Sequence, residues 1–185
     1  MKLQDTSHPV RIWDADADAP ELANVALGQV DIAIGEQIWE FPSAEHAWQI
    51  TKFINPDGSM NETQSEIVTY LLGIEDPVEV KEEARLQSQY YIPQYDKDDA
   101  GHYTSTLPLR RMIEIISFKA RELGAENLEK YRNSFIYESP GINATQNPGS
   151  WGMILFEDDE TGEATAEGAN FIGRIWMRRI LRMVV

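Results

Sequence analysis

The segment Phe41–Phe53, FPSAEHAWQITKF, concentrates side chains that can take part in chemistry. Glu45, Gln49 and Lys52 recur at i, i+4 and i+7, so a helix would place them on one side. The ends of this stripe would be about 10 Å apart at a rise of 1.5 Å per residue, too far for a direct ion pair. Both ends could still face one bound molecule. Because the first helical turn favours an ionised carboxylate, we expect Glu45 to act as a base or as a stabiliser of positive charge.

A helix over residues 44–54 must position these groups. Ser43, directly before it, is a favoured N-cap residue. An apolar stripe spaced three and four residues apart would dock the helix: Ala47, Ile50 and Ile54. The plainer alternative is an ordinary packing helix, with Glu45 and Lys52 on the surface and Trp48 in the core.

The chain before this helix predicts a β-hairpin. Residues 29–41 alternate on either side of Gly35-Glu36, and a glycine at the first turn position is typical of a type II′ turn. Short apolar segments elsewhere predict three further strands, at 10–13, 134–139 and 151–156.

Beyond Pro42 the apolar period changes from two residues to 3.6, which predicts helices. We expect them at 60–72, 76–91, 107–123, 125–133 and 170–185. Asp76 followed by Pro77 marks one start, and Gly124 marks one end. Loops are expected at 92–103, 140–150 and 157–170. Together these elements predict a mostly helical α+β fold with a small antiparallel sheet, in a single domain over 1–185.

The amino-acid composition excludes or disfavours several kinds of site and partner. The 185 residues include no cysteine and only three histidines, which excludes a thiolate nucleophile and argues against a metal site. We expect neither a metal nor a cofactor. No apolar run is long enough for a membrane span and no signal peptide is visible, so we expect a cytoplasmic protein. The net charge of −15 argues against an extended nucleic-acid surface, although local basic clusters could still hold a small anionic ligand.

Residues 22–53 resemble the start of the NADAR (YbiA-like) superfamily. That family shows an F-S-N-F element, a hairpin, and then W-P-T-S-E-H-Y-F-Q-A-x-K-F. Leu22–Val25 takes the place of the first element, and Phe41–Phe53 falls on the second. Near the other end, Trp151-Gly152 and Gly168–Met177 look like the family's W-G and G-x-N-x-L-G-x-x-L-M elements. Order and rough spacing agree across most of the chain, except in its middle third.

The resemblance implies an N-glycosidase, which cuts the bond between a base or amine nitrogen and a phosphorylated ribose. Family substrates include riboflavin-pathway intermediates and ADP-ribose attached to guanine. The implied partner is therefore a small nucleotide, ADP-ribose or a ribose phosphate derivative. The catalytic residues implied are Glu45, Lys52 and Asn147. The ligand-binding residues predicted with them are Asn24, His46, Gln49, Tyr103, Trp151, Gly168, Asn170 and Arg179.

Cleavage of an N-riboside creates an oxocarbenium-like centre at the anomeric carbon. A carboxylate at Glu45 could stabilise that charge or align a water. Lys52 has two possible roles. If partly desolvated, its neutral amine could attack C1 and form a Schiff base with the opened sugar; otherwise it could simply hold the phosphate.

The terminal helix offers a second set of candidates. Gly168 and Asn170 lie at its start, where they could bind an anion or serve as a plain cap. Arg179 shares the apolar face, so it needs either a buried carboxylate or a ligand phosphate. Three other arginines form a separate stripe that suits solvent: Arg174, Arg178 and Arg182.

Several aromatic groups could belong to the site or to the core. Trp39, Tyr103 and Trp151 could stack on a base, but such residues also pack in cores. For His46 we favour a packed, hydrogen-bonded histidine over a catalytic one.

Three functions are consistent with these patterns. The first is a hydrolase of N-glycosidic bonds. The second is a non-catalytic module that binds NAD or ADP-ribose, suggested by Met153, which stands where the family usually has an aspartate. Asp158 or Asp159 from the acidic loop could substitute for that aspartate. The third is an acidic interaction protein that blocks a basic partner surface, suggested by the net charge of −15.

Overall fold

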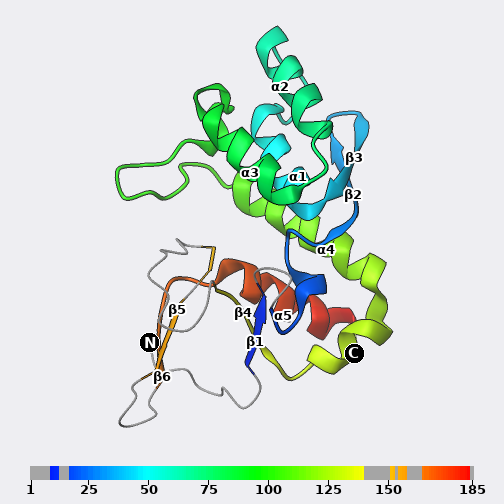
Figure 1. Ribbon diagram of the computed structural model, residues 1–185, viewed down its shortest axis with the longest axis vertical. Helices are drawn as coiled ribbons and strands as arrows, with labels where there is room; N and C mark the ends of the chain where they lie inside the picture. Colours follow the sequence, from blue (N-terminus) through cyan, green and yellow to red (C-terminus); the bar gives the residue numbers. More distant parts are fainter. Residues whose placement is uncertain (1–8, 13–16, 140–150, 153, 158–163, 184–185) are drawn as a thin grey trace. The chain divides into compact units, whose positions relative to one another are not determined.

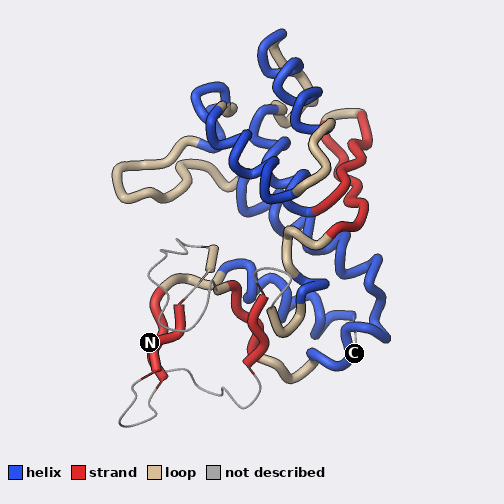
Figure 2. Tube along the Cα trace, viewed as in Figure 1, coloured by secondary structure: helices blue, strands red, loops and turns tan. Residues whose placement is uncertain are grey.

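The structure is a computed structural model, and it describes residues 9–12, 17–139, 151–152, 154–157 and 164–183 (Figure 1). The chain forms two compact units. The central unit is Asn24–Lys119, and the terminal unit combines Met1–Ala23 with Ala120–Val185. Helices predominate, together with three two-stranded sheets among the described residues (Figure 2), so the predicted α+β class is confirmed. One domain over the whole chain stays a prediction, because each unit is compact by itself.

The central unit begins with the predicted hairpin. Strands β2 (Leu27–Ile34) and β3 (Gln37–Ser43) pair in antiparallel fashion around a two-residue turn. Gly35 has φ 61°, and a Cβ there would lie 2.1 Å from the carbonyl oxygen of Asp57. Only glycine suits both the backbone angle and this close approach. The inner face of the hairpin is buried through Val30, Ile32, Ile34 and Phe41.

Helices follow, and most begin where capping residues predict. They are α1 (Ala44–Ile50), η2 (Thr51–Phe53), α2 (Glu62–Leu72), α3 (Pro77–Leu86), η3 (Ser88–Tyr90), η4 (Pro93–Tyr95) and α4 (Leu107–Leu128). Asp76 caps α3 by accepting a hydrogen bond from Val78 N, as expected for a helix start there. That helix ends at Leu86 instead of the predicted Tyr91, and a short 3-10 turn follows.

Gly124 interrupts α4, as predicted, with φ 75° inside the helical run. Residues 107–119 of α4 belong to the central unit, and the remainder belongs to the terminal unit. The predicted helix at 125–133 is therefore the end of α4 followed by η5 (Glu129–Tyr131).

The terminal unit also contains η1 (Pro20–Leu22) and two strand pairs. β1 (Pro9–Ile12) is parallel to β4 (Phe135–Glu138), and β5 (Ile154–Glu157) is antiparallel to β6 (Ala164–Glu167). β1, β4 and β5 fall on predicted strands. The prediction of a loop over all of 157–170 is wrong, because β6 forms there. The β6 sequence, ATAE, has no apolar run. The strand is therefore defined by its pairing with β5 and not by its own composition.

Helix α5 (Phe171–Met183) packs on β4 within the terminal unit. Asn170, in the left-handed region at φ 49°, donates its Nδ2 to Ile136 O at 3.0 Å and accepts from Glu138 N at 3.3 Å. Gly173 lets α5 approach β4, since a Cβ there would lie 2.1 Å from Ile136 O. The apolar face of the helix is buried through Ile172, Ile175, Trp176 and Ile180.

Candidate functional site

Helix α1 is buried along its whole length, and its start is held from two sides. Ser43 caps it as predicted, with Oγ accepting from His46 N at 3.2 Å. The carbonyl oxygen of Asn24 accepts from Glu45 N at 2.9 Å. Glu45 and Lys52 are only 6% and 8% exposed. The alternative that placed these two charged side chains on the surface is therefore wrong.

The three polar groups of the stripe form one hydrogen-bonded chain. Gln49 Nε2 donates to Glu45 Oε1 at 2.6 Å, and Lys52 Nζ donates to Gln49 Oε1. We call this chain the Glu45–Gln49–Lys52 relay. The helical spacing predicted that the three groups share one side, and the structure adds that the amide links the carboxylate to the ammonium.

Burial makes the charged form of Lys52 less stable than it would be in water. Burial lowers the pKa of Lys52 from 10.5 to about 8; Glu45 opposes that change, while Lys97 and Lys81 add to it. Its Nζ also lies 5.1 Å from the ring centroid of Trp48 and 5.3 Å from that of Tyr91. With a pKa of about 8, the neutral fraction at pH 7 is roughly three-hundred-fold larger than for an ordinary lysine.

Lys52 and Gln49 open onto a pocket of about 330 Å³ in the central unit. The other residues that line it are Lys81, Arg85, Ser88, Tyr91, Tyr95, Lys97 and Tyr103. Four of the nine lining side chains are thus basic, in a chain whose net charge is −15. We call it the basic pocket. Glu45 does not line it; its carboxylate is bonded to Gln49, which does.

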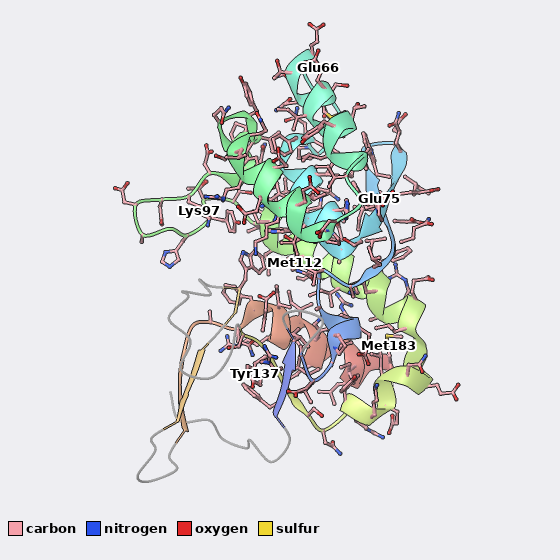
Figure 3. All side chains as sticks on the ribbon, in the orientation of Figure 1. Glu66, Glu75, Lys97, Met112, Tyr137 and Met183 are labelled. Atoms are coloured by element: carbon pink, nitrogen blue, oxygen red, sulfur yellow. The ribbon has the colours of Figure 1, made fainter. Side chains whose placement is uncertain are left out.

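Lys97 lies on a loop between η4 and α4 (Figure 3). This loop contributes Lys97 and Tyr103 to the pocket lining. The two residues form an isolated antiparallel bridge, and Lys97 Nζ lies 4.9 Å from the Tyr103 ring centroid. The turn is held by Asp98 Oδ1, which accepts from Ala100 N at 3.0 Å and His102 N at 2.8 Å. These bonds give an exposed loop a defined shape.

Helix α3 supplies the other two cations. Lys81 and Arg85 are four residues apart and so share one face. Arg85 also pairs with Glu82 at 2.9 Å, an exposed contact that contributes little stability by itself.

Tyrosine rings supply the apolar part of the wall. Tyr103 meets Trp48 edge to face at 6.4 Å and Tyr95 at 6.2 Å between ring centroids. Burial raises the pKa of Tyr91 to about 12, with a smaller contribution from Tyr103, so this ring stays uncharged near neutral pH.

Three predicted site residues therefore line one pocket: Gln49, Lys52 and Tyr103. His46 does not. It is fully buried, and its Nε2 lies 2.9 Å from the carbonyl oxygen of Ile74, which can only accept. Nδ1 therefore accepts from Ser43 Oγ at 2.8 Å. The ligand-binding assignment of His46 is corrected to a packing role, because both ring nitrogens are already bonded to protein groups.

Asn24 lies beside the start of α1 and is 8% exposed. Its Nδ2 approaches Met112 Sδ at 3.9 Å, and its buried Oδ1 has no hydrogen-bond partner among the described residues. Since Asn24 does not line the basic pocket, its described role is to hold the helix start through its backbone.

The remaining predicted residues belong to the terminal unit. Trp151 is half-buried and meets Phe171 edge to face at 6.0 Å, while Gly168 is exposed at φ 106°. The side chain of Asn170 is bonded to β4, which favours the capping alternative over an anion site. Arg179 is half-buried and makes no hydrogen bond or ion pair with any described residue. As predicted, an exposed stripe is formed by Arg174, Arg178 and Arg182.

Some of the residues considered in the sequence analysis lie outside the described part of the chain: Asn147, Met153, Asp158 and Asp159. Other functional candidates were missed by sequence reasoning, namely Lys81, Arg85, Tyr91, Tyr95 and Lys97. The available signal was the i, i+4 pair of cations within KEEAR, which stands out in an acidic chain.

Three further findings concern metal binding, membrane spans and similarity to known proteins. No cluster of three or more histidine, aspartate or glutamate side chains suited to a metal occurs in the part of the chain that the structure describes. None of the described helices combines the length and the apolar character that a bilayer crossing requires. No family model, curated protein or solved structure matches this chain, so the NADAR resemblance stays a prediction.

Proposed function

We propose that this protein hydrolyses the N-glycosidic bond of a ribose-phosphate compound, such as an ADP-ribosylated base or a phosphoribosyl amine. The observation that carries the proposal is the position of Lys52: a desolvated amine opens onto a pocket lined by three further cations. Burying a lysine is costly, and such lysines often serve as nucleophiles.

The basic pocket suits the recognition of a phosphorylated sugar. Lys81, Arg85 and Lys97 supply positive charge for phosphate oxygens, and arginine can bind them in bidentate fashion. The volume of about 330 Å³ is at the lower end of the range for small-molecule sites. Uncharged tyrosine rings offer surfaces for a sugar or base and do not repel an anion.

The chemistry begins with neutral Lys52. Its Nζ forms a bond to C1 of the ribose while the bond from C1 to the leaving nitrogen breaks. The proton that Nζ loses passes to the leaving nitrogen through solvent. Ring opening gives an imine, and water then adds to the imine carbon, releasing ribose phosphate and restoring the amine. The overall change is glycoside plus water to free base plus sugar phosphate.

In this scheme Glu45 acts at a distance. Its carboxylate touches Gln49 and not the pocket wall, so it supplies negative charge near the reaction centre without direct contact with the sugar.

The lack of contact between Glu45 and the pocket also favours the second candidate, a module that binds NAD or ADP-ribose without turnover. In that case Lys52 would be a phosphate ligand.

The test is base release from ADP-ribosylated guanosine, followed by chromatography. We expect the wild type to release guanine-containing product and Lys52→Arg to release none, because arginine keeps the charge but cannot become a neutral nucleophile. Borohydride should trap a sugar adduct on the Lys52 peptide of the wild type only. Lys130→Arg, which changes an exposed lysine, is the matched control and should behave as wild type.

Two results would separate the candidates. Calorimetric binding of ADP-ribose without release or trapping would support the binding module and refute the hydrolase. Release that Lys52→Arg retains in full would refute the nucleophile and leave Lys52 as a phosphate ligand.

A further inference from the structure

We propose that Gln49 is a positioning residue: its amide couples the Glu45 carboxylate to the Lys52 amine and holds Nζ at the wall of the basic pocket. The inference deepens the proposed function and rests on it only for the catalytic consequence. The coupling itself can be measured without any substrate.

The chemistry of the two neighbours decides the orientation of the amide. A carboxylate can only accept hydrogen bonds, and an ammonium can only donate them. Gln49 must therefore turn its NH₂ towards Glu45, at 2.6 Å, and its carbonyl oxygen towards Lys52. Gln49 is 4% exposed, so few other orientations are open to it. The relay locks three side chains through two hydrogen bonds.

The position of Gln49 in the helix explains why this side chain is needed. Glu45 and Lys52 are seven residues apart, about 10 Å along a helix, and cannot pair directly. Gln49 is i+4 from the first and i−3 from the second, the spacings at which helical side chains meet. An amide at this position is both donor and acceptor, so it can hydrogen-bond to the carboxylate and to the amine at the same time.

Other charged groups surround Lys52 and must be considered with Gln49. Lys81 and Arg85 on α3 and Lys97 on the loop before α4 are positive. Tyr91, Tyr95 and Tyr103 also line the pocket. Among the described charged groups that shift the Lys52 pKa, Glu45 raises it, while Lys97 and Lys81 lower it. Glu45 thus opposes the cations, and the carbonyl oxygen of Gln49, which accepts from Nζ, also favours the charged amine.

A fixed hydrogen bond also orients the reactive nitrogen. When Nζ loses a proton, one remaining N–H can still donate to Gln49 Oε1. The lone pair is then free to face the pocket, where the proposed substrate binds. A lysine without this restraint would sample several rotamers and lose rate through misalignment.

The experiment measures the titration of Lys52 in the full-length protein. Each lysine is labelled with trace acetic anhydride across a pH series, and the extent is read by peptide mass spectrometry. Lys52 of the wild type should reach half its maximal reactivity near pH 8. The remaining lysines serve as internal controls in the same samples.

Two variants of Gln49 should shift this midpoint in opposite directions. Gln49→Met keeps the size of the side chain but removes the oxygen that accepts from Nζ. The Lys52 midpoint should therefore fall by about one pH unit, which corresponds to about tenfold more neutral Lys52 at pH 7. Gln49→Glu places a carboxylate beside Nζ, so the midpoint should rise. The control is Gln29→Met, the same exchange at an exposed glutamine that also donates to a carboxylate, that of Asp31. It should leave the Lys52 midpoint unchanged.

The outcomes separate this inference from the proposed function. If both Gln49 variants fold, as judged by circular dichroism, and titrate Lys52 like the wild type, Gln49 only fills space and the relay is refuted. If the midpoints shift as expected but no glycoside is cleaved, the relay holds and the hydrolase fails. If cleavage occurs, its pH–rate profile should shift with the Lys52 midpoint in each variant; a profile that does not move would overturn the positioning role.

Discussion

We expect Lys52→Met to increase the free energy of unfolding at pH 7. Burial lowers the pKa of Lys52 from 10.5 to about 8, so keeping the amine protonated in the folded state costs about 3 kcal/mol at 1.36 kcal/mol per pKa unit. Methionine fills similar space without charge, but it leaves Gln49 Oε1 without its donor, at a cost of about 1 kcal/mol. The net gain should be about 2 kcal/mol.

This gain should disappear in alkaline solution. Between about pH 8 and 10.5, the unfolded chain keeps a proton on Lys52 that the folded chain has released, so wild-type stability rises with pH through this window. Above pH 10.5 the burial cost is gone. The variant then retains only its unpaired amide oxygen, and it should be about 1 kcal/mol less stable than the wild type.

Urea unfolding at pH 7 and above pH 10.5, followed by tryptophan fluorescence, measures both differences. Other lysines and tyrosines titrate in both proteins, so their effects cancel in the comparison. Lys130→Met is the control: a hydrogen bond to Glu21 raises the pKa of this exposed lysine, so its removal should not stabilise the protein at pH 7. A difference for Lys52→Met that does not change with pH, or a loss of stability at pH 7, would refute this account of the buried amine.

Two further predictions follow from the described geometry, and a third tests the assignment of Arg179 as a phosphate ligand, which rests on the sequence alone because Arg179 does not line the basic pocket. Glu45→Gln should lower the Lys52 pKa below about 8, measured by lysine labelling. It should still reduce base release by about a hundredfold, because the lost negative charge near the oxocarbenium-like centre should outweigh the larger neutral fraction of Lys52; unchanged turnover would remove Glu45 from the mechanism. Arg179→Ala should weaken ADP-ribose binding by about 1.5–3 kcal/mol in calorimetry and Arg182→Ala should not, whereas equal effects would make Arg179 structural. Gly35→Ala should lower the free energy of unfolding by at least about 1 kcal/mol, because its Cβ would meet a backbone oxygen at 2.1 Å; an unchanged urea midpoint would contradict this.

Local patterns in the chain were enough to predict the helix that carries the relay. Ser43 at the N-cap and the spacing of Glu45, Gln49 and Lys52 involve residues within two helical turns of one another, and helical geometry alone relates them. The hairpin over 29–41 was equally predictable, since Gly35 sits where its turn demands a positive φ.

The same local patterns did not predict that the Glu45 and Lys52 side chains are buried. A stripe with a carboxylate and an ammonium normally faces water, yet Glu45 of α1 and Lys52 of η2 are both more than nine-tenths buried. What buries them is the packing of the hairpin, α2 and α3 around a short helix, which no periodicity within residues 44–54 can report. His46 follows the same logic, because its partner Ile74 lies 28 residues away in the chain.

The sequence by itself determined that Glu45, Gln49 and Lys52 share one side of a helical segment, because their spacing of four and three residues requires it. Only the tertiary structure decided that the relay ends in a basic pocket. Lys81, Arg85 and Lys97 come from α3 and from the loop before α4, and long-range packing brings their charges to Lys52. Strand β6 shows the same division, since its pairing with β5 rests on hydrogen bonds to another segment and not on its own apolar pattern. Local geometry is encoded over a few residues, whereas burial and the gathering of charge depend on which distant segments exclude water together.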